Sequence, residues 1–408
     1  MDEATARAVM ERLGAFLDQF ESCLSRRVQR RNASRYVEGL LNDSERKSMQ
    51  AMHGRLADPG SYQGLQHFIT HALWASPPFW KRLRQVVPVR AGLLLLDETS
   101  FPKQGRHSVG VARQYCGALG KVANCQVAVS SALRADGLTW PLALELYLPK
   151  EWADDEARRA GAGIPPSLGH REKWRIGLTQ IRHIRAAGFT LNGVVADAEY
   201  GRVTAFRTAL ERSGLIYGLG CRTTQTVWPV KARRYWTITA LMDRQPADGW
   251  AYVSWGTGTK RPLAAHFFAQ RVRPKHARRE CWLLCERRES GERKAYLSNL
   301  PASASLEEVV ALTHGRWPIE QQYREFKDDL GLDHFEGRSY TGWNHHAVLA
   351  ALTFTFIQLE RRRHTEPLPT FPAVRNLVRE IVTIQYLFTR PDLLEMLTSF
   401  KGKHPLRN

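Results

Sequence analysis

The stretch Gly92-Leu93-Leu94-Leu95-Leu96-Asp97 decides the fold class of this chain. A continuous apolar run of this length that ends at a carboxylate is typical of a central strand buried on both faces. Two further strand-like segments follow, at residues 122–133 and 138–148, and Asp136-Gly137 between them is a hairpin signal. The three segments together predict an antiparallel meander.

Helices and strands alternate after this meander. Residues 171–187 have the apolar spacing of a helix closed by Gly188, and residues 203–213 form a second such helix closed by Gly214. Buried strands are predicted after each helix, at residues 191–197 and 216–221. Three strands followed by helix, strand, helix and strand indicate an α/β fold.

The regions on either side of this core differ from it. Residues 1–88 carry apolar residues at helical spacing, whereas residues 222–300 contain short strand-like runs separated by turns rich in Gly, Pro and charge. A capping box at Ser305 and Glu308 begins another helix, which we expect to break at Gly315 or Pro318 and to continue to about Leu330. A last apolar helix over residues 347–359 and a basic tail are expected in the final segment.

Composition and charge narrow the function. The chain has 408 residues with 43% hydrophobic and 24% charged residues, which excludes a disordered tail or a fibre. Its 59 Lys and Arg against 40 Asp and Glu leave a net charge of +19, which favours a polyanionic partner over a small neutral substrate. The start of the chain has no signal-like apolar core and no apolar stretch suits a membrane span, so we expect a cytoplasmic location with the six cysteines as buried free thiols.

The positive charge is concentrated in two places. Residues 222–300 hold 16 Lys or Arg against 6 Asp or Glu, together with five of the twelve tryptophans. Indoles in a basic surface can stack on bases, but tryptophan is also a common core residue; the candidates for base contact are Trp228, Trp236 and Trp255. The second place is the basic run in the helical leader, either a solvated face or a phosphate-tracking surface, made of Arg26, Arg27, Arg30, Arg31 and Arg35.

Three acidic residues are the candidate catalytic groups. Asp97 and Asp197 end the two buried strands, and Glu320 lies on the helix that follows the basic insertion. Carboxylates brought together at adjacent strand ends repel one another unless a cation neutralises them, and oxygen ligands select hard ions such as Mg²⁺ or Mn²⁺. Two such ions held between carboxylates promote phosphodiester displacement. The histidines near this helix (His314, His334, His345 and His346) are read as structural.

Three motifs resemble those of the DDE transposases of bacterial insertion sequences. They are Leu96-Asp97-Glu98-Thr99, the stretch from Val195 to Gly201 and Arg316-Trp317-Pro318-Ile319-Glu320. Arg316, Glu320 and Lys327 match the spacing of that family's Tyr, Arg, Glu, Lys signature, while Thr313 occupies the Tyr position and Pro318 interrupts a freely helical segment. The resemblance covers nearly the whole chain.

The resemblance implies an RNase H-like mixed sheet with a helical N-terminal DNA-binding domain (1–88), a catalytic core (89–221), a basic β-rich insertion (222–300), the core continued by the Glu helix (301–340) and a helical C-terminal segment (341–408). Asp97, Asp197 and Glu320 would bind two Mg²⁺ or Mn²⁺ ions, and Arg316 and Lys327 would hold phosphates. Water would then cleave the transposon end, and the freed 3′ hydroxyl would attack target DNA. The implied partners are the inverted repeats of the transposon ends, target DNA and a second copy of the chain, at the bacterial nucleoid and away from membranes.

Two other functions remain open on the sequence alone. A catalytically inactive DNA-binding regulator derived from a transposase would keep the fold and the charge. An RNase H-like nuclease would keep the three acids but would not join strands.

Overall fold

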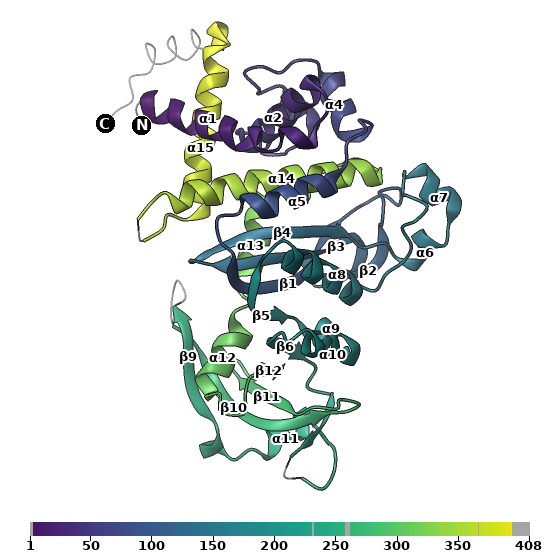
Figure 1. Cartoon of the computed structure of the whole chain (residues 1–408), viewed down its shortest axis with the longest axis vertical. Coiled ribbons are helices and arrows are strands. Elements are labelled where there is room, and N and C mark those ends of the chain that lie inside the picture. The colour runs from purple at the N-terminus through teal and green to yellow at the C-terminus, as the bar shows by residue number, and fades with distance from the viewer. Residues whose placement is uncertain (1–2, 231, 258–261, 366, 394–408) are drawn as a thin grey trace.

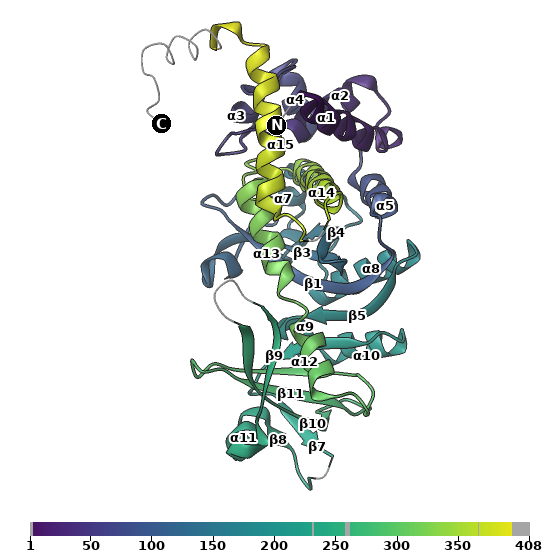
Figure 2. The same cartoon turned by 90° about the vertical axis from the view of Figure 1, so that its left-hand side faces the viewer.

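The structure is a computed structural model that describes residues 3–230, 232–257, 262–365 and 367–393. It is elongated, as Figures 1 and 2 show, with a helical part at one end, a mixed sheet in the middle and a β-rich part at the other end. The N-terminal helices and the last helix lie together at the helical end, although they are far apart in the sequence.

The leader is helical, as predicted. Its five α-helices are α1 (Glu3–Asp18), α2 (Arg27–Leu41), α3 (Met49–His53), α4 (Tyr62–Thr70) and α5 (Ser76–Val86). Their apolar stripes face inward; Leu13, Phe16 and Leu40 are almost completely buried. Helices α2, α4 and α5 pack against α14 (Tyr340–Arg362), so the two ends of the chain share one apolar core.

The central sheet begins with the predicted meander. Strand β1 (Ala91–Pro102) pairs antiparallel with β3 (Lys121–Ala135), which pairs antiparallel with β4 (Leu138–Leu146). Positive φ angles of 50° at Asp136 and 71° at Gly137 form the tight turn between β3 and β4, as the Asp-Gly signal predicts. A short edge strand, β2 (Ala112–Cys116), also pairs with β3 and was not predicted, because five residues are too few to show a period.

Two parallel strands complete this core. Strand β5 (Thr190–Ala196) lies parallel to β1, and β6 (Tyr217–Cys221) lies parallel to β5. The order β4-β3-β1-β5-β6, three antiparallel strands followed by two parallel crossover strands, is the RNase H-like mixed sheet that was expected. The crossovers contain α6 (Lys150–Ala153), α7 (Glu156–Gly161), α8 (Lys173–Ala186), α9 (Ala198–Gly201) and α10 (Thr204–Arg212).

The apolar run of β1 is buried on both faces. Leu94 and Leu96 belong to the apolar cluster that includes Ile176 of α8. Leu93 and Leu95 face the opposite side, in the cluster that includes Ile319 of α13 (Pro318–Arg324). Because side chains alternate along a strand, the next odd position directs Asp97 to the α13 side.

The β-rich insertion continues the same sheet. Strand β12 (Arg293–Ser298) pairs antiparallel with β6 and joins to the core the strands β7 (Thr226–Pro229), β8 (Trp236–Thr237), β9 (Ala251–Thr257), β10 (Pro262–Pro274) and β11 (Cys281–Arg287). A short helix, α11 (Ile238–Arg244), follows β8. Short strands were predicted for this region, at the positions of β9, β10 and β11, but their edge-to-edge continuity with the core was not, because sequence patterns do not identify strand partners.

The chain then returns to the core. Helix α12 (Leu306–His314) starts at the predicted Ser305–Glu308 capping box, and α13 starts at Pro318 after the predicted break. The helix continues to about Leu330 as predicted, but its last turn, η4 (Glu325–Asp329), is π-helical, which the sequence pattern did not indicate.

Two corrections concern the C-terminal part. Helix α14 covers Tyr340–Arg362 and is longer than the predicted 347–359, because polar residues continue the helix on both sides of its apolar centre. A further helix, α15 (Phe371–Phe388), occupies part of the segment that was read as a basic tail. Its buried Phe371, Val374, Val378, Ile381 and Val382 have helical spacing that the intervening charges obscured. Residues 394–408 lie outside the described part of the chain.

Other predictions about composition can be compared with this fold. All six cysteines are free, and five of them are buried. His345 and His346 are buried and hydrogen-bonded to backbone carbonyls, which fits their structural interpretation. Within the described residues, no helix is both long and apolar enough to cross a bilayer.

Candidate active site

Asp97 and Asp197 lie at one edge of the central sheet. They are each two residues beyond the paired Leu95 and Val195, and β1 and β5 are parallel, so both strands present their carboxyl ends at this edge. Asp97 is almost buried, with 8% of its surface exposed.

Asp197 is also held by its local backbone. It is the N-cap of α9, where its Oδ1 accepts hydrogen bonds from the backbone N–H groups of Glu199 (3.0 Å) and Tyr200 (3.4 Å). Close packing requires glycine at position 201 of the same motif, because a Cβ at Gly201 would lie 1.8 Å from the carbonyl oxygen of Gly220 on β6. The stretch from Val195 to Gly201 therefore packs α9 closely against the sheet and fixes the direction of the Asp197 carboxylate.

Arg316 links Glu320 to the aspartate edge of the sheet. The Arg316 guanidinium donates from Nη1 to Asp97 Oδ2 (2.5 Å) and from Nη2 to Glu320 Oε1 (2.7 Å). Asp197 also acts electrostatically on this guanidinium. Arg316 thus joins Asp97 to Glu320, while Asp197 lies at the same sheet edge and, in the described part of the chain, forms no hydrogen bond with the guanidinium. Glu320 is more exposed than either aspartate.

The electrostatics of the aspartates are unfavourable for two negative charges. Burial raises the pKa of Asp97 to about 7, since the opposing effect of Arg316 is partly cancelled by Asp197. Burial also raises the pKa of Asp197, against the influence of Arg316 and two backbone N–H groups. One arginine does not fully neutralise the two aspartates, so this edge of the sheet favours the binding of a further cation.

The donor set suits a hard divalent ion. All three side chains offer only oxygen, and the Arg316 guanidinium already lies between Asp97 and Glu320. Among the described residues, no three His, Cys, Asp or Glu side chains are spaced as metal ligands in this arrangement. Asp97, Asp197 and Glu320 could therefore hold a metal only if the Arg316 guanidinium moved aside.

Two buried tyrosines near the carboxylates were not anticipated from the sequence. Tyr323 lies one turn after Glu320, and its hydroxyl is 2.5 Å from Ser130 Oγ on β3, the residue paired with Asp97. Burial and the nearby carboxylates raise the pKa values of Tyr323 and Tyr200 well above 10, so both phenols stay neutral. The spacing of three from Glu320 was the available signal for Tyr323.

A cavity of about 730 Å³ opens between this edge and the insertion. Asp197, Glu320 and Arg316 line one side of it. The remaining lining includes cations and aromatic rings, namely Arg222, Arg288, Arg293, Lys294, Trp255, Trp317 and Tyr296. The arrangement brings carboxylates, positive charge and stacking surfaces to one hollow, as a site for nucleic acid requires.

The structure separates the three candidate tryptophans. Trp255 lines the cavity, and its ring lies 4.2 Å from that of His314. In the described residues, Trp228 and Trp236 are not part of the cavity lining; Trp228 packs edge-on against Tyr235, and two guanidinium groups lie over Trp236.

A buried ionic cluster packs behind Trp255. The sequence did not reveal this cluster. Glu286 on β11 is completely buried and accepts hydrogen bonds from Arg288 (2.6 Å), Tyr296 (2.9 Å) and His314 (3.2 Å). Burial alone would raise the pKa of Glu286, but its hydrogen bonds and the nearby charges hold that pKa at about 2. The ring of His314, fixed by Glu286, packs against Trp255.

The remaining predicted DNA-binding residues lie elsewhere. Lys327 donates from Nζ to the backbone carbonyl of Ser100 (2.9 Å) and is not among the described residues lining the cavity. Thr313, which was not predicted to bind DNA, lines the cavity and donates its hydroxyl to its own helix. On α2, Arg30 pairs with Glu21, and the side chains of Arg26, Arg27 and Arg31 are exposed at the helical end of the molecule, away from the insertion (Figure 1).

Comparisons with known proteins agree with these features. A family described as DDE superfamily endonuclease matches residues 19–262, and one described as transposase DDE domain matches residues 171–356. The probable transposase for insertion sequence element IS701 of Microchaete diplosiphon is 32% identical over 195 residues, which are 46% of this chain and 48% of that protein. The chain thus spans about half the length of the curated relative that it matches.

Among solved structures, the piggyBac transposase in a synaptic complex with hairpin DNA is similar over 90% of this chain and 73% of its own. The TM-score is 0.45 and the identity 9%, so this likeness adds nothing to the fold that the strand order already defines. The first family match, by contrast, spans more than half of the sequence and includes both aspartates. Residues 171–356 are similar to the transposase DDE domain, and the chain as a whole belongs to the DDE superfamily endonucleases.

Proposed function

We propose that this chain is a DNA transposase that cleaves at transposon ends and joins the resulting 3′ hydroxyl to target DNA. The observation that carries this proposal is that Arg316 joins Asp97 to Glu320 at the sheet edge where Asp197 also lies, beside a basic cavity. The family membership and the net charge of +19 support DNA as the substrate.

The three acids would act as the ligands of two Mg²⁺ or Mn²⁺ ions. Bound there, such ions supply activation of the attacking oxygen and stabilisation of the leaving oxygen in phosphodiester displacement. Asp197 is preorganised for this role by its two backbone hydrogen bonds, and burial keeps competing water away from Asp97.

When DNA binds, Arg316 would release its carboxylate partners and contact a phosphate of the DNA instead. Its guanidinium has a fork of N–H donors that suits phosphate oxygens as well as carboxylates. In the free protein it partly neutralises Asp97, and with DNA present it would hold the backbone next to the scissile bond. Tyr323 and Tyr200, both neutral phenols, would form a rigid wall behind Asp97 without adding charge.

The cavity would hold the transposon end. Arg222, Arg293 and Lys294 can pair with backbone phosphates, and Trp255 is the tryptophan best placed to stack on an unpaired base near the carboxylates. The arginines of α2 would contact DNA farther from the cleavage point. Because transposition joins two ends, we expect a homodimer or larger assembly on DNA, acting in the cytoplasm at the bacterial nucleoid.

The test is cleavage and joining of a duplex that carries the inverted repeat flanking the gene, in Mg²⁺ or Mn²⁺. Asp97→Asn, Asp197→Asn and Glu320→Gln should each abolish nicking while gel-shift affinity stays near that of the unmodified protein. Asp154→Asn, at an exposed acid in the crossover between β4 and β5, is the matched control that should cleave normally.

The other outcomes identify the two alternative functions. DNA binding without metal-dependent nicking by the unmodified protein would indicate a regulator. Nicking without strand joining would indicate a nuclease. Full cleavage by any of the three acid variants would remove that residue from the catalytic set.

A further inference from the structure

A second positively charged groove lies between α8 and α10, apart from the cavity that contains Trp255. Its volume is about 770 Å³. The basic residues in its lining are His170, Arg171, Arg175, Arg182 and Arg185, and none of the described residues that line it is acidic. The sequence patterns had assigned no function to this face of α8.

Three of these arginines form one stripe on α8. Arg175, Arg182 and Arg185 are seven and three residues apart, which places them on the same side of a helix with 3.6 residues per turn. All three are exposed. The groove therefore presents a row of guanidinium groups along the helix axis.

Two of the three arginines lack a neutralising partner. Arg175 lies 3.4 Å from Glu172 in an exposed pair, which is a weak interaction. Arg182 donates to Thr179 Oγ1 (3.1 Å) and Arg185 to the Ser213 carbonyl (3.3 Å), both uncharged, and within the described residues neither forms an ion pair with a carboxylate. Their positive charge is available to an external anion.

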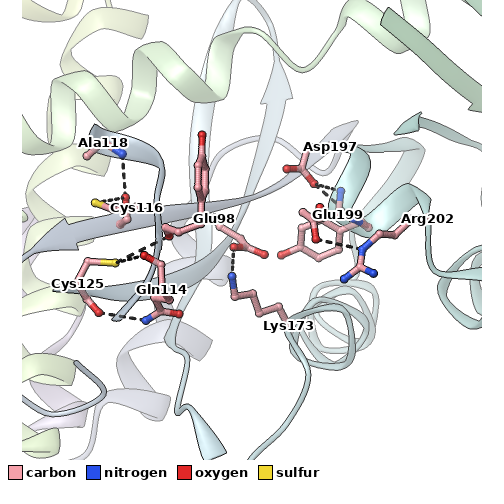
Figure 3. A network of polar contacts seen from close by, with 12 residues as sticks. Glu98, Gln114, Cys116, Ala118, Cys125, Lys173, Asp197, Glu199 and Arg202 are labelled. Carbon is pink, nitrogen blue, oxygen red and sulfur yellow. Dashed lines mark hydrogen bonds and ion pairs between the residues drawn. The ribbon is translucent and has the colours of Figure 1, made fainter. Parts of the chain in front are cut away.

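The groove connects with the catalytic edge of the sheet. Lys173, in the first turn of α8, forms an ion pair with Glu98, the residue that follows Asp97 (Figure 3). A hollow of about 460 Å³ beside this pair shares His170 and Trp174 with the groove.

The same hollow also extends toward the cavity that contains Trp255. Glu199 lines the hollow and pairs with Arg202 on one side (Figure 3) and with Arg222, a cavity residue, on the other. Each carboxylate along this path has a cationic partner, so repulsion of a phosphate backbone is reduced. The connecting hollow is lined by three paired carboxylates and two cations, so it joins the basic cavity to the stripe on α8 without an unpaired negative charge among the described residues on the way.

We propose that the groove between α8 and α10 binds the phosphate backbone of the DNA arm that extends beyond the scissile bond, on the side away from the β-rich insertion. This inference rests on the proposed function. A strand held in the cavity and cut at the carboxylates must continue past them, and the charged stripe lies on the connected surface. Guanidinium groups fit phosphate oxygens with two N–H donors each, so this contact should not depend on base sequence.

The experiment measures affinity for two duplexes that contain the inverted repeat flanking the gene. One ends at the cleavage position, and the other extends about two helical turns, or about 20 base pairs, beyond it. Arg182→Ala/Arg185→Ala should weaken binding of the extended duplex roughly 10-fold and lower the slope of log K against log salt by about 2, while binding of the short duplex is unchanged. An extension of shuffled sequence should behave like the native one.

Arg278→Ala/Arg279→Ala is the matched control, because both residues are exposed in the turn after β10 and lie on the insertion. Any loss of affinity in this control should be equal for the two duplexes. Arg182→Lys/Arg185→Lys should retain most of the arm-dependent binding, which separates lost charge from misfolding.

The proposal is overturned if Arg182→Ala/Arg185→Ala leaves the affinity for both duplexes unchanged or lowers both equally. Failure of the unmodified protein to nick DNA would contradict the proposed function instead, and the comparison of short and extended duplexes would still report on the groove.

Discussion

Asp97 and Glu286 are both buried acids, but their surroundings have opposite effects. Glu286 accepts three hydrogen bonds, from Arg288, Tyr296 and His314, and its pKa is held at about 2. Asp97 has one arginine partner and another carboxylate nearby, and burial raises its pKa to about 7.

This difference distinguishes a structural acid from a candidate ligand. A carboxylate with enough donors stabilises the fold in its ionised form, whereas one with too few is costly until a further cation arrives. The insertion thus uses its buried charge to build a rigid support for Trp255, while the core leaves its charge incompletely neutralised at the site where we propose chemistry.

The largest effect on stability is expected at Asp97. Replacing it with Asn removes a charge that burial disfavours, so at pH 8 without divalent ions the free energy of unfolding should rise by up to about 4 kcal/mol. The folded pKa lies above the unfolded value, so the gain should shrink as the pH falls from about 7 to about 4 and vanish below that window. Urea unfolding at several pH values measures this change.

Glu286→Gln should have the opposite sign. The pKa of Glu286 is lowered from 4.5 to about 2, so its ionised form contributes about 3 kcal/mol to the free energy of unfolding at neutral pH. That contribution should be present above pH 4.5 and be lost as the pH falls toward 2. The same unfolding experiment tests it, and equal effects of the Asp97 and Glu286 substitutions would contradict the distinction between the two acids.

The smallest effect is expected at Trp255, the cavity residue that Glu286 supports through His314. Trp255→Ala should weaken binding of the flanking inverted repeat by about 1 to 3 kcal/mol, because it removes a stacking surface. Trp236→Ala is the control and should change affinity little, since two arginines already cover that ring. Fluorescence of 2-aminopurine placed at the transposon end reports whether a base stacks there, and an identical response from both variants would argue against Trp255.

The sequence was most informative where a local pattern has one structural solution. Apolar runs ending in Asp97 and Asp197 predicted adjacent strand ends, Asp136-Gly137 predicted the hairpin, and Ser305 with Glu308 predicted the start of α12. Each of these features depends on residues close together in the chain. The resemblance to DDE transposases also rests on short motifs of this kind.

The sequence was less informative where the outcome depends on contacts between distant segments. Nothing local to Glu286 indicates that it meets His314, and the π-helical turn after α13 interrupts a pattern that reads as regular helix. The three insertion tryptophans looked equivalent until the pairing of β12 with β6 placed β9 beside the carboxylate edge. The stripe on α8 was overlooked because its arginines acquire a role only beside α10 and Glu98.

The sequence by itself determined the α/β order and the excess of positive charge and singled out three candidate acids, because periodicity, composition and short motifs are properties of the chain. Tertiary structure alone decided that Arg316 joins Asp97 to Glu320, that one candidate tryptophan of three lines a cavity with Asp197 and Glu320, and that a second basic groove lies between α8 and α10. The physical reason is that burial and electrostatic interaction depend on distance in space, and folding brings together groups that are more than 200 residues apart in the chain, as with Arg316 and Asp97.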